Sequence, residues 1–306
     1  MKIVIIGAGG VGGYFGGKLA KAGNDTSFIV RGKNLKAITK NGLQIKSING
    51  DFKVFPLATS EFDSVKNADL VILGIKSWQI IDIANSIKPF LSNNTMVLPL
   101  QNGADNAEKL LSILKPENVI AGLCRIVSKI EEPGIINHFA YEPEIIFAEN
   151  NNEKTERIQV IKSIFDKAGF KNSISNDIHL DIWRKFLFIT TISGIGALTR
   201  SVLGEIRENV FLKKKMYATA EEIVNIANKK EISLSDTDIE KTFSIIESLN
   251  FQTTSSLQRD IMEGKPSELS NFNGFIVEKG KELGIDTPVN SFIYQCLLLQ
   301  ENKVRN

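Results

Sequence analysis

Apolar runs and amphipathic stretches alternate along the first 175 residues of the chain. Ile3–Ile6 is a continuous apolar run, which is typical of a strand buried on both faces of a parallel sheet. A helix is expected from about Gly10 to Ala22, where Gly23 ends it, and "DTSFIV" follows as a second strand. The start of the chain therefore predicts a βαβ unit.

The alternation continues beyond this unit. The segment "GLQIKSINGDFKVFPLA" predicts a hairpin that turns near Asn49-Gly50. Further strands are expected in "ADLVILGIK", "TMVLPL", "NVIAGLCRIV", "GIINHF", "PEIIFAE" and "KNSIS". Helices are expected in "SWQIIDIANSIKPFL", from about Ala104 and around residues 154–168.

Long helical periods replace this pattern from about Asp177. They cover "IHLDIWRKFLFITTISGIGALT", "NVFLKKKMYATAEEIVNIANKK", "DIEKTFSIIESL" and "VNSFIYQCLLLQENK". A chain of 306 residues with 42% hydrophobic content is long enough for two domains. We predict an α/β protein with a Rossmann-type doubly wound parallel sheet in residues 1–175 and an all-helical domain in residues 176–306.

Composition and charge exclude several classes of function. The net charge is +2, with 37 Lys and Arg evenly mixed with 35 Asp and Glu, which argues against nucleic-acid binding. No run suits a membrane span or a signal peptide, so we expect a cytoplasmic protein that binds no membrane. The apolar C-terminal helices leave a homodimer open.

Cysteine and histidine are too rare for a metal centre or a disulfide framework. Cys124 and Cys296 lie far apart without a CxxC pair, and we expect each to be a reduced core thiol. His138 and His179 are the only histidines, and we expect both to be structural. The sequence therefore predicts no metal site.

A glycine-rich turn follows the first strand. Gly7, Gly9 and Gly12 fit G-x-G-x-x-G, in which the first allows a tight turn, the second lets backbone approach a pyrophosphate and the third allows close helix–strand packing. The helix that starts at Gly10 and Val11 then presents free N–H groups and a positive dipole end to the anion. A turn without any ligand is the alternative, but the βαβ context favours dinucleotide binding.

The end of the second strand favours NADP(H) over NAD(H). An NAD site carries an acidic residue there for the ribose 2′-hydroxyl, whereas this chain carries Arg31, followed by Gly32 and Lys33. Asp25 stands at the other end of the strand. Arg31 suits a 2′-phosphate, and a solvated Arg-Lys turn is the alternative.

Two further polar residues follow buried strands, where ligands bind in such sheets. Lys76 follows "ADLVILGI", where it can reach a cofactor phosphate or ribose, or can simply be exposed. Asn102 follows "TMVLPL" and can bond near the nicotinamide or the substrate, or can simply form an Asn-Gly turn.

The helical half contains one lysine on an otherwise apolar helix. Lys185 can stay protonated beside an anionic substrate and donate a proton, or it can be a lysine that snorkels at a helix end. A polar cluster, "TTSSLQRDIMEGKPSELSNFNG", follows later in the chain. It includes Ser255, Ser256, Asp260 and Glu268, which either line a site or form a capped helix with solvated charges.

These motifs together resemble the ketopantoate reductase family over nearly the whole chain. The ordered set is the glycine turn, Arg31, "IKSWQ", "QNG", "WRK", and "SSLQRDI" followed by "SELSNFNG". The resemblance implies reduction of a 2-keto acid with NADPH, and a helical domain related to that of 6-phosphogluconate dehydrogenase. It also implies roles for individual residues: Lys185 as general acid, Asn102, Ser256 and Glu268 as substrate contacts, and Arg31 with Lys76 as cofactor contacts.

The chain departs from the family pattern next to the lysine. Members of the family carry substrate-binding asparagines four and eight residues after it, and this chain has Ile189 and Ser193 there, on the helix face of Lys185. We therefore expect an NADPH-dependent reductase of a small 2-keto acid, with ketopantoate as first candidate and Ser193 among the substrate contacts. Another 2-keto or imino acid, or an NADP(H)-binding redox sensor without turnover, are the alternatives.

Overall fold

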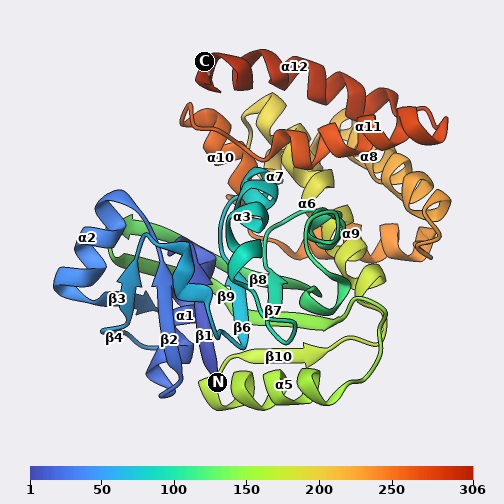
Figure 1. Cartoon of the computed structure of the whole chain (residues 1–306). Coiled ribbons are helices and arrows are strands. Elements are labelled where there is room, and N and C mark those ends of the chain that lie inside the picture. The colour runs from blue at the N-terminus through green and yellow to red at the C-terminus, as the bar shows by residue number, and fades with distance from the viewer. Residues whose placement is uncertain (306) are drawn as a thin grey trace. The chain divides into compact units, whose positions relative to one another are not determined.

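The computed structural model describes residues 1–305, and its chain divides into two compact units (Figure 1). The first unit is Met1–Ile178, and the second begins at His179. The sequence predicts this boundary after residue 175, between the last strand of the first unit and the long helix that follows. Each unit has its own architecture and is described separately.

A five-stranded sheet forms the centre of the first unit. Its strand order is β5-β2-β1-β6-β7, and every neighbouring pair is parallel. The strands are β1 (Lys2–Ile6), β2 (Asp25–Ile29), β5 (Leu57–Thr59), β6 (Leu70–Leu73) and β7 (Met96–Pro99). The predicted parallel doubly wound sheet is confirmed.

Helices and short 3-10 turns alternate with the strands of the first unit. The helices are α1 (Gly10–Lys21), α2 (Gly32–Asn41), α3 (Ile80–Ile87), α4 (Asn106–Leu111) and α5 (Glu156–Ala168). The 3-10 turns are η1 (Phe62–Val65), η2 (Ser77–Gln79), η3 (Lys88–Phe90) and η4 (Pro116–Asn118). Helix α2 was not predicted, and Ile38 is its only buried residue.

A second, mixed sheet belongs to the same unit and was not predicted. Its order is β10-β9-β3-β4, with β8 antiparallel to β9. The strands are β3 (Leu43–Ser47), β4 (Phe52–Val54), β8 (Ile120–Glu132), β9 (Ile135–Glu149) and β10 (Lys171–Ile174). The predicted hairpin is confirmed, because β3 and β4 pair antiparallel around Gly50, whose φ is +97°.

The segments "GIINHF" and "PEIIFAE" are one long strand, β9, rather than the two strands that were predicted. Tyr141 has a φ of +66° within this strand, and the pairing of β8 with β9 shifts register nearby. Such bulges interrupt the alternation of side chains without ending a strand. The sequence pattern therefore showed a break where the backbone continues.

Helix α1 packs closely against strands of both sheets. A Cβ at Gly16 would lie 2.6 Å from the ring of Phe28 on β2, and one at Gly13 would lie 2.6 Å from Ile136 on β9. The glycines of this helix therefore allow backbone approach on two faces. This packing places the start of α1 firmly above the end of β1.

The second unit is helical throughout its described residues, as predicted. Its helices are α6 (Ile178–Thr199), α7 (Leu203–Glu208), α8 (Val210–Lys229), α9 (Asp236–Ser248), α10 (Ser256–Met262), α11 (Asn273–Leu283) and α12 (Pro288–Arg305). The 3-10 turn η5 (Leu269–Asn271) precedes α11. Aromatic contacts join α6 to the region of α11, between Trp183 and Phe275 and between Phe186 and Phe272.

The cysteines and one histidine can be compared with their expected roles. Cys124 is buried, as expected of a core thiol, whereas Cys296 is only half-buried. His138 is 1% exposed, bonds to Ser47 Oγ through Nδ1 at 2.8 Å, and packs on the ring of Tyr14. His138 is therefore part of the core, as predicted.

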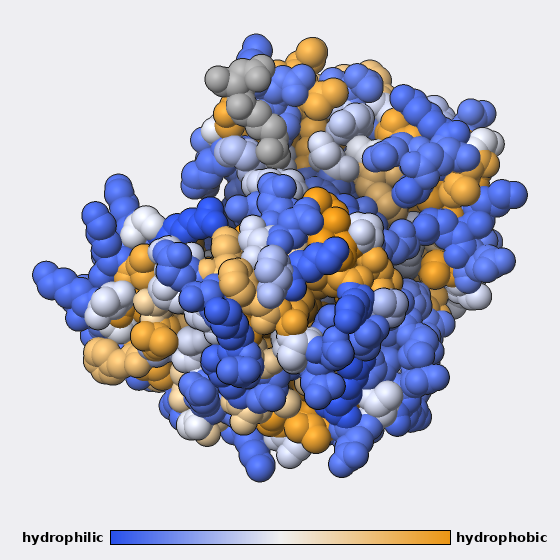
Figure 2. Space-filling model, viewed as in Figure 1, coloured by the Kyte–Doolittle hydropathy of each residue, from blue (hydrophilic) through white to orange (hydrophobic). Residues whose placement is uncertain are grey.

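The surface mixes polar and apolar residues. On the face shown in Figure 2, hydrophilic residues surround scattered hydrophobic ones. Exposed apolar side chains of the chain include Phe55, Phe211 and Phe292. Among the described residues no helix combines the length and apolarity that crossing a membrane requires. Residues 1–305 also contain no group of three or more His, Cys, Asp or Glu side chains that could hold a metal ion.

Candidate functional site

The turn after β1 is held tightly against the end of β6. Gly7 has a φ of +94°, and a Cβ there would lie 2.8 Å from the carbonyl oxygen of Gly74. A Cβ at Gly12 would lie 2.0 Å from the carbonyl oxygen of Gly7, closer than any real contact. Both glycines are therefore required by the fold itself, whether or not a ligand binds.

Gly9 differs from its neighbours because nothing in the protein crowds it. It is the N-cap of α1, and the nearest atom to a Cβ there would be Gly74 O at an ordinary 3.6 Å. The first N–H groups of a helix have no intrahelical acceptors. The open space beside Gly9 and the start of α1 thus fits a diphosphate, which a Cβ would displace.

Gly10 is constrained by strand β8. A Cβ on Gly10 would lie 2.6 Å from the carbonyl oxygen of Ser128 and 2.7 Å from its Oγ. The lack of a side chain at Gly10 is thus explained by packing. At the predicted anion site, Gly10 can therefore offer only its backbone N–H group.

Arg31 lies just past β2, on the same sheet edge as the glycine turn. It is exposed, it is the N-cap of α2, and its guanidinium lies 5.3 Å from the ring centre of Phe62. Gly7 N donates to Ile29 O at 2.9 Å, which ties this strand end to the turn. Asp25 pairs with Lys2 at the opposite end of the strands, so no acid stands where Arg31 does.

Lys76 and Asn102 follow β6 and β7 at the same edge. Lys76 is the N-cap of η2, and its Nζ lies 5.6 Å from the centre of the Trp78 ring. Asn102 is half-buried in the loop before α4. Gln101, 6% exposed, fixes this loop because its Nε2 donates to Leu73 O at 2.9 Å, across the two strand ends.

The structure therefore brings the predicted cofactor residues to one edge of one sheet. This edge contains Gly7, Gly9, Gly10, Val11, Gly12, Arg31, Lys76 and Asn102. The sequence analysis missed Gly74, which closes the turn from β6. The glycine directly after the apolar run "LVIL" was the available signal.

Lys185 lies on α6 in the second unit and is half-buried. Its neighbours Trp183 and Phe186 are 2% and 0% exposed and pack on Phe272 and Phe275 of the α11 region. These contacts fix the helix on both sides of the lysine. The segment carrying Glu268 precedes Phe272 directly, so the second unit places the two charged candidates on adjoining elements.

The helix face that follows Lys185 is mixed in character. Ile189 is half-buried, and Ser193 is 1% exposed. Thr190 and Thr191 are fully buried, and their Oγ1 atoms have no hydrogen-bond partner among the described residues. This part of α6 thus carries hydroxyl groups that can still form hydrogen bonds, whereas position 189 carries no side-chain amide.

Arg184 anchors the same helix electrostatically. Its Nε donates to Asp238 Oδ1 of α9 at 2.8 Å. Burial by itself would raise the pKa of the Asp238 carboxyl, but hydrogen bonds from Arg184 and Ser235 outweigh it and lower that pKa below its usual value. The pair joins α6 to α9 one residue away from Lys185.

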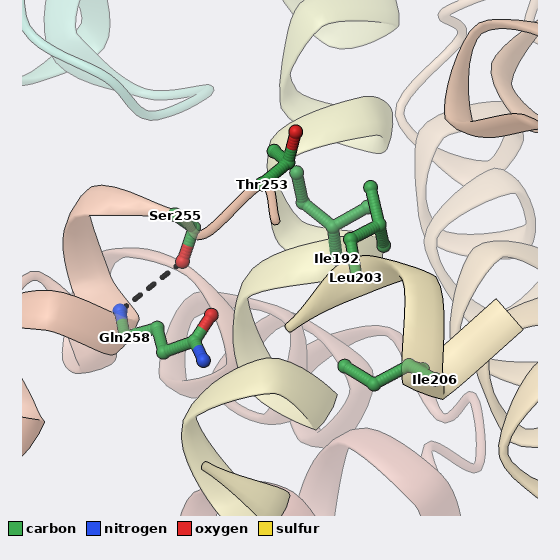
Figure 3. A pocket seen from close by; sticks show the side chains of 6 residues that line it. All are labelled: Ile192, Leu203, Ile206, Thr253, Ser255 and Gln258. Atoms are coloured by element: carbon green, nitrogen blue, oxygen red, sulfur yellow. Dashed lines mark hydrogen bonds between the residues drawn. The ribbon is translucent and has the colours of Figure 1, made fainter. Parts of the chain in front are cut away.

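Ser255 and Ser256 begin helix α10. Ser255 is the N-cap, and its Oγ accepts from Gln258 N at 3.1 Å, whereas Ser256 is exposed. Ser255 also lines a small, partly open pocket together with Ile192 of α6 (Figure 3).

Glu268 is 7% exposed and directly precedes η5. Its carbonyl oxygen accepts the first hydrogen bond of this turn, from Asn271 N at 2.9 Å. The adjacent Ser267 is bonded to Glu301 of α12. The sequence analysis did not single out Glu301, because 34 residues separate the partners and nothing in the local pattern marks it. Asp260, also in this polar cluster, lies on α10 and is half-buried.

Comparison with known proteins agrees with this arrangement. The family model "Ketopantoate reductase PanE/ApbA" matches residues 3–152, and "Ketopantoate reductase PanE/ApbA C terminal" matches residues 177–301. The chain is 33% identical over 301 residues to YkpB of Bacillus subtilis, an uncharacterized oxidoreductase, with 98% of this chain and 99% of that one covered. It is 31% identical over 304 residues to the 2-dehydropantoate 2-reductase of Pyrococcus horikoshii, covering 99% and 98%.

Solved structures show the same fold over the whole chain. A PanE/ApbA family ketopantoate reductase from Ralstonia eutropha superposes with a TM-score of 0.92 at 30% identity and covers 100% of both chains. A D-mandelate dehydrogenase solved with NADH and anilino(oxo)acetate superposes with a TM-score of 0.91 at 23% identity, again over 100% of both chains. The two family models and the full-length relatives together show that this chain belongs to the ketopantoate reductase family.

Proposed function

We propose that the protein reduces 2-dehydropantoate to pantoate with NADPH, a step of pantothenate biosynthesis. The observation that carries the proposal is Lys185, a half-buried ammonium group on the long helix α6 of a ketopantoate reductase fold. Relatives named 2-dehydropantoate 2-reductase in Pyrococcus horikoshii and Aquifex aeolicus cover nearly the whole chain and support this substrate.

The residues of the first unit have defined tasks in this proposal. Bound NADPH supplies the hydride. The space beside Gly9 and the N–H groups that start α1 hold the diphosphate. Arg31 pairs with the 2′-phosphate, Lys76 with a phosphate or ribose, and Asn102 orients the nicotinamide or the keto acid.

The residues of the second unit hold the keto acid and move the proton. As the keto carbon gains a hydride, negative charge develops on its oxygen, and Lys185 donates the proton that neutralises it. Glu268 accepts a hydrogen bond from the polar end of the substrate, while Ser256 and Ser193 contribute hydroxyl groups. A proton donor on this helix favours an enzyme over an NADP(H)-binding sensor, which needs none.

A second candidate substrate follows from Ile189, where the family pattern has an amide. Isoleucine offers only apolar surface, which suits a 2-keto acid without the hydroxymethyl group of ketopantoate. The D-mandelate dehydrogenase of similar fold was solved with an aromatic oxo acid and NADH, so both an aromatic keto acid and NADH belong in the test.

The test is steady-state oxidation of NADPH and NADH with a panel of 2-keto acids. We expect kcat/KM to be highest for ketopantoate with NADPH. Arg31→Asp should reduce the preference for NADPH, because it replaces a hydrogen-bond donor to the 2′-phosphate by a negative charge that repels it. Equal efficiency of the two cofactors would refute the NADPH assignment. Cofactor binding without turnover of any keto acid would favour the sensor.

A further inference from the structure

The segment that carries Glu268 turns inward abruptly. Residues 262–266 are exposed, whereas Ser267 is 1% exposed, Glu268 7% and Leu269 0%. A chain that becomes buried within one residue must provide partners for the backbone and side-chain polar groups it takes out of water. The position of Glu268 therefore depends on what bonds to Ser267.

Glu301 on α12 provides these partners. Ser267 N donates to Glu301 Oε1 at 2.9 Å and to Oε2 at 3.2 Å, and Ser267 Oγ donates to Oε2 at 2.6 Å. Leu269 N in turn donates to Ser267 Oγ at 3.3 Å. The residues on both sides of Glu268 are thus tied to one carboxylate that is itself 3% exposed.

A second buried glutamate bonded to α12 gives a matched comparison. Glu222 of α8, 6% exposed, accepts from Val289 N at 2.7 Å, from Asn290 N at 2.9 Å and from Asn290 Nδ2 at 2.7 Å. These groups lie at the N-terminus of α12, where the helix dipole stabilises a carboxylate. The role of Glu222 is explained by helix capping.

Capping of a helix N-terminus does not explain the burial of Glu301. It lies near the C-terminal end of α12, where the helix dipole does not favour a negative charge, and burial of a carboxylate is costly. The carboxylate accepts three hydrogen bonds from Ser267 there. Its described effect is to hold the turn that carries Glu268.

We propose that Glu301 is a positioning residue for substrate binding, acting through Ser267 on Glu268. The carboxylate of Glu301 fixes the backbone before Glu268, and the Ser267 hydroxyl fixes the backbone after it. The inference rests on the proposed substrate-binding role of Glu268. It adds a residue of the last helix to the substrate site, although that residue never touches the keto acid.

The experiment compares Glu301→Ala with the control Glu222→Ala. With ketopantoate and NADPH, we expect Glu301→Ala to raise KM about tenfold or more, because small displacements of a positioning group are costly, with kcat changed far less. Glu222→Ala should lower the thermal midpoint and leave KM within about twofold. Glu301→Gln should restore KM, since its oxygen can accept from Ser267 N and its NH₂ can donate to Ser267 Oγ.

A second readout does not depend on turnover. Hydrogen exchange of a peptide covering residues 265–272 should accelerate in Glu301→Ala and stay unchanged in Glu222→Ala. If Glu301→Ala does not fold, Ser267→Ala carries the test, because it removes the hydroxyl bonds and keeps those of the backbone N–H. A KM unchanged in the folded variant, or raised equally in Glu222→Ala, would overturn the positioning role.

Glu268→Gln separates this inference from the proposed function. A raised KM in Glu268→Gln, with no further rise when Glu301→Ala is added, supports both assignments. A raised KM in Glu268→Gln with none in Glu301→Ala overturns only the positioning role. An unchanged KM in Glu268→Gln removes Glu268 from the substrate site and overturns both.

Discussion

The glycine turn of the first unit and the Lys185 region of the second are built in different ways. The turn consists of backbone, and its constraints are steric: a Cβ at Gly12 would lie 2.0 Å from Gly7 O. The candidate residues of the second unit are side chains on α6, on α10 and in the segment before η5. A backbone site tolerates almost no change, whereas a side-chain site can exchange its donors and so change its substrate.

The largest effect is expected from Lys185→Ala. A positioned general acid contributes roughly 10²- to 10⁴-fold in rate, so kcat should fall within that range. The affinity for NADPH should stay nearly the same, because the proposed cofactor residues belong to the other unit. Stopped-flow oxidation of NADPH and calorimetric binding measure the two quantities.

A matched control for this prediction is Lys241→Ala. Lys241 is an exposed lysine on α9, and its removal should leave kcat unchanged. Near-normal turnover in Lys185→Ala would mean that the proton comes from another group. A loss of NADPH binding would instead show that the two sites are not independent.

The next effect sharpens the comparison within the glycine turn. Gly12→Ala should destabilise the fold by about 1–3 kcal/mol or more, because the clash is with backbone that cannot move aside. Gly9→Ala should leave the thermal midpoint nearly unchanged, because its nearest neighbour is at 3.6 Å, and should weaken NADPH binding. Thermal unfolding with and without NADPH shows whether a glycine is required by the fold, as expected of Gly12, or by the ligand, as expected of Gly9. Equal behaviour of the two variants would contradict this difference.

The same difference explains what the sequence could predict. The turn, the parallel sheet and the helical unit follow from local patterns: apolar runs, glycine spacing and helical periods. Helix α2 was missed because it buries only Ile38, and β9 was divided in two because the positive φ of Tyr141 interrupts its alternation. In each case tertiary pairing, which the local pattern does not contain, decides the structure.

The candidate site could be predicted to the same extent. The predicted cofactor residues Gly7, Gly9, Arg31 and Lys76 follow strand ends, and parallel strands bring such positions to one edge. The tie between Ser267 and Glu301 joins separate helical elements and leaves no periodic signal. Helical packing partners are set by the arrangement of the whole bundle rather than by spacing along the chain.

A smaller effect concerns the substrate and Ile189. Losing a hydrogen bond to a charged group costs about 1.5–3 kcal/mol, so Ile189→Asn should raise kcat/KM for ketopantoate by about tenfold or more. Ile189→Leu, which keeps an apolar side chain, should not. The unmodified protein should still prefer ketopantoate over 2-keto-isovalerate by at least about tenfold, or roughly 1.4 kcal/mol; a smaller preference would refute the assigned substrate and leave the reductase assignment standing.

The smallest effect compares two ion pairs, one in each unit. Asp238 is 4% exposed at its side chain and bonds to Arg184, whereas Asp166 is 53% exposed and pairs with Lys162 on α5. The pKa of Asp166 is also lowered, by hydrogen bonds from Lys162 and Asn172. Water and salt screen an exposed pair, so its contribution to stability is small.

Acid unfolding tests this last comparison. A carboxyl whose pKa is lower in the folded protein stabilises it above its unfolded pKa, about 3.9 for Asp, and this contribution is lost as pH falls through the folded pKa. Asp238→Asn should therefore lower the thermal midpoint at pH 7 by roughly 2–4 °C, or about 1 kcal/mol, and the difference should vanish at acid pH. Asp166→Asn should change the midpoint less, and only at low salt. Two outcomes would contradict this: equal behaviour of the two variants, or an Asp238→Asn difference that persists below the folded pKa. The Arg184–Asp238 pair would then not anchor α6 through its charge, and the geometry around Lys185 would depend on packing by Trp183 and Phe186.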